Sequence, residues 1–370
     1  MSATLGTVYG TIGNHEASPV NGFQPNSLGH STQWVYDLVS TQWRQWIGDD
    51  GAADTQNIGA YSVKHAGSNL RVISLNTNLY YRQNYWLYQK TMIQDPNNQI
   101  AWLAKELEAA EKAGENVYII GHMPPGDSDS FHEGSHYLDQ VFNRYSSTIA
   151  AMFFGHTHKD HFEISYSDYA ARSASNALLT AYICPSLTPT SGMPSFRVYD
   201  VDPVTFGILD STTYIADMTN AAFQTTGPVW TKLYSAKEVY GPTVNPPVTD
   251  ASAELTASFW HKVTEVFETN DAVYNEFLAR KSRGWKAETC AGACKAGEIC
   301  QLRAARAENN CFKPTAGVHF TKRTENKMEH RDECGISVIR ASLNSVTTKK
   351  EVLDTMHFRY LEASEKAKRA

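Results

Sequence analysis

The 370-residue chain has no long apolar run, no excess of positive charge and no Asn-x-Ser/Thr sequon. A membrane-spanning helix needs about 18 consecutive apolar residues, so the sequence predicts no such span. The formal net charge of −6 gives no reason to expect nucleic acid as a partner. The start of the chain has neither a basic region nor a long apolar core, so it does not resemble a signal peptide. The missing sequon argues against heavy N-glycosylation.

Cysteine is scarce as well, and four of the six cysteines are clustered: Cys290, Cys294, Cys300 and Cys311. Their C-x3-C-x5-C-x10-C spacing lacks the paired C-x2-C knuckles of zinc sites, which favours two short disulfides over a zinc site. Cys184 lies in an apolar, strand-like segment and is predicted to be a free core thiol. Cys334 has no evident partner. Disulfides would indicate an oxidising compartment.

The length predicts one large domain and a smaller one. We expect an α/β domain over residues 1–218, a helical, cysteine-bearing subdomain over 219–312, and a charged tail over 313–370. That tail carries twelve Lys and Arg against eight Asp and Glu, although the whole chain is acidic. Because the tail has few aromatics, partial disorder is predicted there.

Apolar periodicity predicts alternating strands and helices. The predicted helices cover residues 34–46, 97–114, 138–147, 254–267 and 272–280. Strands are predicted at 8–12, 70–75, 162–166, 178–183 and 196–201, with two further apolar runs at 117–120 and 151–154. This alternation is typical of an α/β domain.

Three of these apolar runs are followed by residues that bind metals: Gly13-Asn14-His15-Glu16, Gly121-His122 and Gly155-His156-Thr157-His158. Open α/β sheets place their ligands at the carboxyl ends of strands. Imidazole and carboxamide groups that converge there would bind zinc or a similar divalent ion. The sequence therefore predicts a metal site built from these three stretches.

A second zinc-like pattern, His132-Glu133-Gly134-Ser135-His136, satisfies the H-E-x-x-H motif of metalloproteases. That motif works only on a helix, where both histidines share one face. The segment contains Gly and Ser and follows the turn-forming residues 124–129, so a loop is predicted and a protease site is not.

The three stretches together resemble the calcineurin-like metallophosphoesterases, whose later signature blocks are Gly-Asn-His-Glu/Asp, Gly-His and Gly-His-x-His. Their surroundings narrow the match. Residues 11–21, 119–126, 153–158 and 196–199, with the C-terminal cysteine cluster, resemble the acid sphingomyelinase branch. The resemblance covers about Val8 to Cys311 and implies an αββα sandwich with mixed sheets.

The resemblance also implies roles for individual residues. Asn14, His122 and His156 correspond to the ligands of one zinc ion, and His158 corresponds to a ligand of a second. A hydroxide between two such ions would attack the phosphorus. His15 corresponds to the residue that protonates the leaving group. The adjacent glutamate, Glu16, is expected to orient its neighbours.

The activity implied is hydrolysis of sphingomyelin to ceramide and phosphocholine, with relatives acting on nucleotides or other phosphate esters. A lipid or phosphodiester substrate, transient contact with a membrane surface, and an extracellular or lysosome- or vacuole-like location follow from the same resemblance. The aromatic run 79–86 fits either a lipid-facing rim or a packed cluster. A different class of function is a non-catalytic remnant or incomplete gene product.

That alternative arises because the family's earlier blocks, Asp-x-His and Gly-Asp, belong upstream of Asn14. The thirteen residues before Asn14 contain no Asp, Glu or His. Gly48-Asp49-Asp50 and Gly126-Asp127 stand in the wrong order and are predicted to lie in polar loops rather than to replace these blocks. We therefore expect an N-terminally incomplete catalytic domain, a poorly bound second metal and little activity.

Overall fold

The computed structural model describes residues 4–88, 93–190, 192–287 and 289–312. The chain divides into the units Met1–Ala316 and Gly317–Ala370, and only the first contains described residues. The charged tail and Cys334 therefore lie outside the described part. No helix within the described residues is long and apolar enough to cross a membrane.

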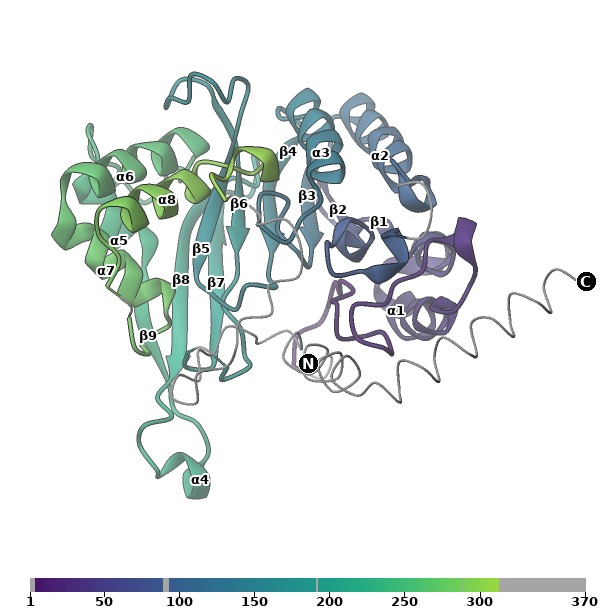
Figure 1. The fold of residues 1–370 in the computed structure, drawn as a ribbon, viewed down its shortest axis with the longest axis horizontal. Helices are drawn as coiled ribbons and strands as arrows, with labels where there is room; N and C mark the ends of the chain where they lie inside the picture. Colours follow the sequence, from purple (N-terminus) through teal and green to yellow (C-terminus); the bar gives the residue numbers. More distant parts are fainter. Residues whose placement is uncertain (1–3, 89–92, 191, 288, 313–370) are drawn as a thin grey trace, which may run out of the picture. The chain divides into compact units, whose positions relative to one another are not determined.

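Within the described residues, six strands form a mixed sheet in the order β1-β2-β3-β4-β6-β5 (Figure 1). Strands β2, β3, β4 and β6 run parallel, and β1 and β5 are antiparallel to their neighbours. The carboxyl ends of the parallel strands therefore meet at one edge of the sheet. The strands are β1 (Tyr61–Lys64), β2 (Leu70–Leu75), β3 (Asn116–Gly121), β4 (Ile149–Phe154), β5 (His161–Tyr166) and β6 (Ala177–Ile183).

Helices α2 (Gln99–Ala113) and α3 (His132–Arg144) pack on one face of this sheet (Figure 1). The apolar positions predicted to share a face of α2 are buried, and they join the core formed by β2, β3, β4 and β6. These core positions of α2 are Ile100, Leu103, Leu107 and Ala110. The spacing of three or four residues predicted this contact, because it places apolar side chains on a single stripe of the helix.

A second, antiparallel sheet contains β7 (Ser195–Val201), β8 (Ile208–Ala216) and β9 (Trp230–Ser235). Aromatic rings fill the contact between the two sheets. Phe153 of β4 meets Tyr118 and Tyr199 edge to face, with ring centroids 5.2 and 4.9 Å apart. The predicted sandwich of two sheets in an α/β fold is thus confirmed, with one mixed and one antiparallel sheet.

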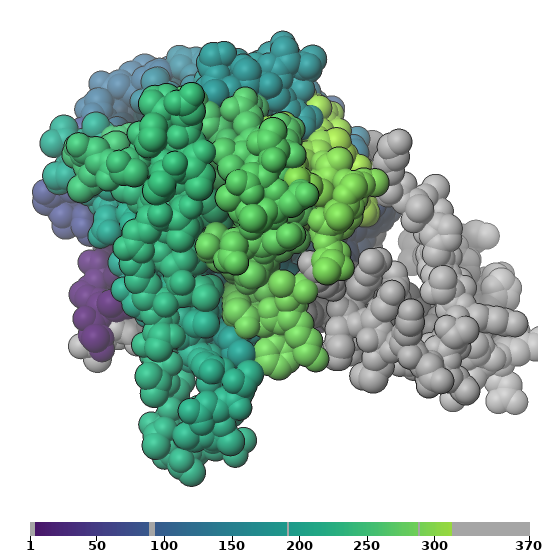
Figure 2. Space-filling model, turned by 90° about the vertical axis from the view of Figure 1, so that its left-hand side faces the viewer, coloured from purple at the N-terminus to yellow at the C-terminus, as the bar shows by residue number. Residues whose placement is uncertain are grey.

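The C-terminal part is helical, as predicted, and contains α5 (Ala236–Tyr240), α6 (Ala257–Thr269), α7 (Asp271–Lys281) and α8 (Ala293–Leu302). These helices share a buried core with β5 and β6, and they form much of the surface in Figure 2. Disulfides join Cys290 to Cys294 and Cys300 to Cys311. Cys184 is a free thiol, as predicted.

Four local predictions were wrong. Residues 8–12 do not form a strand; side chains hold this segment instead, since the carbonyl of Gly10 accepts from Tyr61 and that of Ile12 from Asn78. Helix α1 (Gln33–Ile58) extends past the predicted end and includes Gly48-Asp49-Asp50, with non-helical φ and ψ only at Gly48. Helix α3 includes the H-E-x-x-H segment. Strands β1, β8 and β9 were not predicted at all.

Shorter helices complete the described residues. The four-residue α4 (Phe223–Thr226) lies in the long connection between β8 and β9. The remaining elements are short 3-10 helices: η1 (Asn26–Leu28), η2 (Thr77–Tyr80), η3 (Tyr85–Tyr88), η4 (Pro96–Asn98), η5 (Gly241–Thr243) and η6 (Ala307–Asn309).

Candidate metal and catalytic site

The predicted site lies at the carboxyl edge of the parallel strands. His122 follows the last residue of β3, and the Gly155–His158 turn follows β4. His156 and His158 both adopt left-handed backbone conformations, with φ of 67° and 57°. Such conformations are uncommon outside glycine and are concentrated at functional sites.

Three of the predicted ligands meet there. The side-chain oxygen Oδ1 of Asn14 lies 2.7 Å from Nε2 of His122. The same nitrogen lies 3.3 Å from Nδ1 of His156. Asn14 and His156 are buried. The structure therefore brings together the three residues that were assigned to one metal ion.

Asn21 fixes the orientation of Asn14. The amide nitrogen Nδ2 of Asn14 donates to Oδ1 of Asn21 over 2.7 Å, and the backbone N–H of Asn21 donates to the carbonyl oxygen of Asn14 over 2.9 Å. Because the nitrogen of the Asn14 amide is used in this way, its oxygen faces His122. Asn21 belongs to the sequence block that carried the family resemblance, but a supporting role had not been assigned to it.

Asp129 performs a similar task for His156, and sequence reasoning missed it. Its Oδ2 lies 3.2 Å from Nε2 of His156, on the side of the ring opposite Nδ1. The ring of Tyr81 meets the same imidazole edge to face, with centroids 5.1 Å apart. Together these contacts direct Nδ1 toward His122. The one feature of the sequence that could have identified Asp129 is that its carboxylate comes soon after the Gly121-His122 block.

The loop that carries Asp129 is supported by the C-terminal segment. The carbonyl of Gly126 accepts a hydrogen bond from Nδ2 of Asn310 over 2.9 Å, next to the disulfide-bonded Cys311. A Cβ atom at Gly126 would lie 1.8 Å from the carbonyl oxygen of Ala304, so only glycine allows this close approach. The Gly126 N–H donates to the buried carboxyl of Glu163.

The first part of the aromatic run 79–86 is packed inside the protein, and its end is exposed. Leu79, Tyr80 and Tyr81 are buried, and Tyr81 contacts His156 as described. Tyr85 is exposed to 43%, so the end of the run faces outward. The packed cluster is therefore confirmed for the first part of the segment.

Burial favours the neutral form of His122 and of His158. Desolvation, reinforced by the nearby His156, lowers the pKa of His122 to about 3. Desolvation and the Arg283 guanidinium lower the pKa of His158 to about 4. Neutral imidazole is the form that binds metal ions. His15 is exposed, next to the buried Asn14 in the chain.

The types of donor in this cluster, two imidazoles and a carboxamide oxygen, are ones that divalent transition metals accept. A tetrahedral zinc ion with bonds of about 2.0–2.1 Å holds its ligand atoms about 3.3 Å apart. The separation between His122 and His156 equals that value, and the Asn14 oxygen lies closer, as in a hydrogen bond. In the described part of the chain, however, no three His, Cys, Asp or Glu side chains form a metal-binding group. The cluster has three donor groups only when the amide oxygen of Asn14 is counted together with the two histidines.

The H-E-x-x-H segment is helical, contrary to prediction, because it forms the first turns of α3. It still forms no pair of metal ligands. Nδ1 of His136 lies 3.0 Å from Oε1 of Glu308, and its Nε2 lies 2.9 Å from the amide nitrogen of Gln140. Both ring nitrogens are thus used in contacts with polar neighbours.

Residues 2–160 match the family described as calcineurin-like phosphoesterase. The chain is similar to sphingomyelin phosphodiesterase of Homo sapiens, with 35% identity over 82% of this chain and 46% of the human protein. The chain belongs to the acid sphingomyelinase branch of the calcineurin-like phosphoesterases. Several relatives are named as phosphodiesterases, and the metallophosphoesterase family uses divalent metal ions.

Comparison with two further members of the branch shows what share of their length this chain covers. Sphingomyelin phosphodiesterase 1 of Caenorhabditis elegans is 33% identical over 83% of this chain and 52% of its own length. Acid sphingomyelinase-like phosphodiesterase 3b of Homo sapiens is 31% identical over 80% of this chain and 64% of its own length. The chain spans about half the length of the sphingomyelin phosphodiesterases of Homo sapiens and Caenorhabditis elegans.

Proposed function

We propose that this chain is a sphingomyelinase-type phosphodiesterase, which hydrolyses sphingomyelin to ceramide and phosphocholine and uses zinc as its divalent ion. The observation that carries the proposal is the convergence of Asn14 Oδ1, His122 Nε2 and His156 Nδ1. The names of its relatives supply the substrate, since several are sphingomyelin phosphodiesterases.

Each residue of the cluster has a proposed task. Asn14, His122 and His156 would hold a zinc ion, which supplies Lewis-acid polarisation of a phosphoryl oxygen when bound. His15 donates a proton to the departing ester oxygen, a role suited to an exposed imidazole near neutral pH. Asn21 and Asp129 hold Asn14 and His156 in orientation, and second-shell contacts of this kind tune metal affinity.

We further propose that this chain holds one cation well and a second one weakly. His158 would contribute to the second position, but the described residues gather no complete donor set around it. Because phosphoryl transfer at a two-metal site relies on both ions, hydrolysis by the chain as given is expected to be slow.

The disulfides support an oxidising location, either extracellular or lysosome-like. The proposed substrate is a lipid, so the chain would contact a membrane or micelle surface transiently during turnover.

Zinc binding and turnover test these proposals separately. We expect calorimetry to detect one tight zinc site, which is lost in His156→Ala and retained in the matched control His132→Ala. We expect slow hydrolysis of sphingomyelin in mixed micelles and of bis-p-nitrophenyl phosphate. Loss of zinc only in His132→Ala would refute the assigned ligands, and no zinc binding by the wild type would favour a non-catalytic remnant.

Turnover has its own decisive outcomes. Rapid hydrolysis of sphingomyelin would refute the weak second site. Hydrolysis of bis-p-nitrophenyl phosphate without any of sphingomyelin would refute the lipid substrate and favour nucleotides or other phosphate esters.

A further inference from the structure

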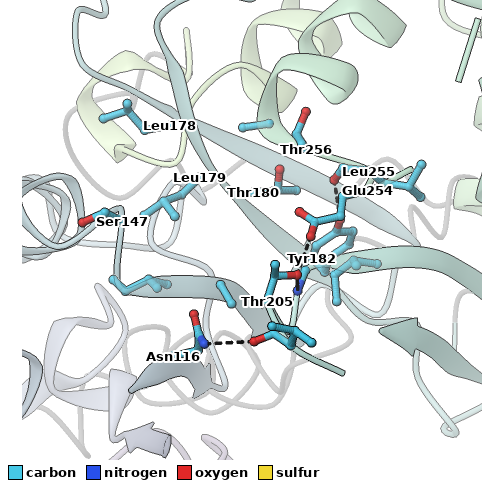
Figure 3. A pocket seen from close by; sticks show the side chains of 16 residues that line it. Asn116, Ser147, Leu178, Leu179, Thr180, Tyr182, Thr205, Glu254, Leu255 and Thr256 are labelled. Carbon is cyan, nitrogen blue, oxygen red and sulfur yellow. Dashed lines mark hydrogen bonds between the residues drawn. The ribbon is translucent and has the colours of Figure 1, made fainter. Parts of the chain in front are cut away.

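A cavity of about 460 Å³ lies at the opposite edge of the larger sheet from the histidine cluster. Asn116 and Ile149, the first residues of β3 and β4, form part of its wall. The histidines instead follow the carboxyl ends of these strands. The rest of the wall comes from β6, including Tyr182 near its end, from the β7–β8 connection and from the segment that leads into α6 (Figure 3). The cavity is therefore separate from the proposed catalytic site.

A fixed carboxylate lies in this cavity. Thr205 donates a hydrogen bond to Oε1 of Glu254, and the Thr205 hydroxyl in turn accepts from the N–H of Gly207. A Cβ atom at Gly207 would lie 2.3 Å from Oε2 of Glu254, so the glycine leaves the space that this carboxylate occupies. The local backbone thus holds Glu254 in one position.

Glu254 has no ion-pair partner among the described residues. The ammonium group of Lys237, in the same region, donates instead to the carbonyl oxygens of Asp250, Ala251 and Ala253. The cavity lining contains no Lys, Arg or His. Its formal charge is therefore a single negative charge.

A second polar residue contributes to the wall. Thr180 lines the cavity and is only 7% exposed. Its Oγ1 is buried and lacks a hydrogen-bond partner within the described residues. Figure 3 shows Thr180 and Glu254 on neighbouring parts of the wall.

The rest of the lining selects the kind of cation. Apolar side chains contribute the smaller part of the wall, among them Ile149, Leu178 and Leu255. Calcium needs six to eight oxygen ligands, and one carboxylate with a few hydroxyls does not provide them. A volume of this size is typical of sites for small organic molecules. We propose that this cavity binds a small organic amine, whose protonated nitrogen pairs with Glu254 and whose apolar part contacts the aliphatic wall.

Ligand-observed NMR and calorimetry on the purified full chain test the proposal with 2-phenylethylamine and with its neutral analogue 2-phenylethanol. We expect saturable, millimolar or tighter binding of the amine and binding of the alcohol weaker by about 10-fold. Glu254→Gln keeps an acceptor for Thr205 but removes the charge, and should weaken amine binding by a similar factor. Glu276→Gln, an exposed carboxylate on α7, is the matched control and should bind as the wild type does.

Equal binding of the amine and the alcohol would overturn the proposal. So would unchanged binding in Glu254→Gln, or the absence of saturable binding by the wild type. These outcomes are independent of zinc and of phosphodiester hydrolysis.

Discussion

Asp129 offers the sharpest test of how the histidine cluster is held. Asp129→Ala removes the carboxylate that lies 3.2 Å from Nε2 of His156. The backbone contacts of the loop are kept, since the N–H of Asp129 donates to Asp127 and its carbonyl accepts from the N–H of Arg82. The substitution should therefore free the imidazole without unfolding the loop.

Losing a contact of this kind typically weakens metal affinity by about 10- to 100-fold. The Asp129 side chain is 36% exposed, so solvent screens its charge. We therefore expect the lower end, about 10-fold or about 1.4 kcal/mol. Asp129→Asn retains an acceptor but not the charge, and its zinc affinity should be intermediate.

The assay is zinc affinity by competition with a chelator, paired with denaturant unfolding of the metal-free protein. Glu133→Gln, an exposed carboxylate in the first turn of α3, is the control for a general effect of lost negative charge. Wild-type zinc affinity in Asp129→Ala would refute the positioning role. An equal loss in Glu133→Gln would show that the effect is not specific to His156.

Three further predictions concern Asn21, Glu163 and the Cys300–Cys311 disulfide. Asn21→Gly suits the left-handed φ of 67° at this position. Because it frees the Asn14 amide, it should weaken zinc binding by about 10-fold, whereas Asn21→Asp should not weaken it. Calorimetry measures the zinc affinity of both variants. Burial, and then Asp127, raises the pKa of Glu163 well above its usual range. The wild type should therefore lose stability as pH rises above about 4.3, and Glu163→Gln should melt higher than wild type at neutral pH and equally at acid pH. Cys300→Ser with Cys311→Ser should lower the free energy of unfolding by about 3 kcal/mol in urea titration, because the disulfide closes a short loop with a sequence separation of 11.

The elements with strong periodicity were predictable. Helix α2 and strands β2 to β6 have continuous apolar runs or faces that pack on a core, so their local pattern agrees with their burial. The segment 8–12 has the same apolar character but lacks a partner strand within the described residues. Its carbonyls bond to side chains from β1 and η2, and such partners are distant in sequence.

The candidate site likewise contains residues that could be predicted from the sequence and residues that could not. Asn14, His122 and His156 were predictable because each follows an apolar run and a glycine. Asp129 was not, since its contact with His156 depends on how the loop after β3 folds back. The helix at His132 was missed because Gly134 and Ser135 are weak helix formers. Both residues are buried there, so tertiary packing outweighs local preference.

The hydrogen bond between Asn310 and Gly126 connects the segment of the Cys300–Cys311 disulfide to the loop that carries Asp129. The Cys300–Cys311 bond holds Asn310 against the loop that ends at Asp129. If reduction loosens that loop and weakens zinc binding, then bound zinc must protect the disulfide by the same factor, because linkage is reciprocal. Thiol titration under graded reducing conditions, with and without zinc, measures this coupling; identical midpoints would show that the two are independent.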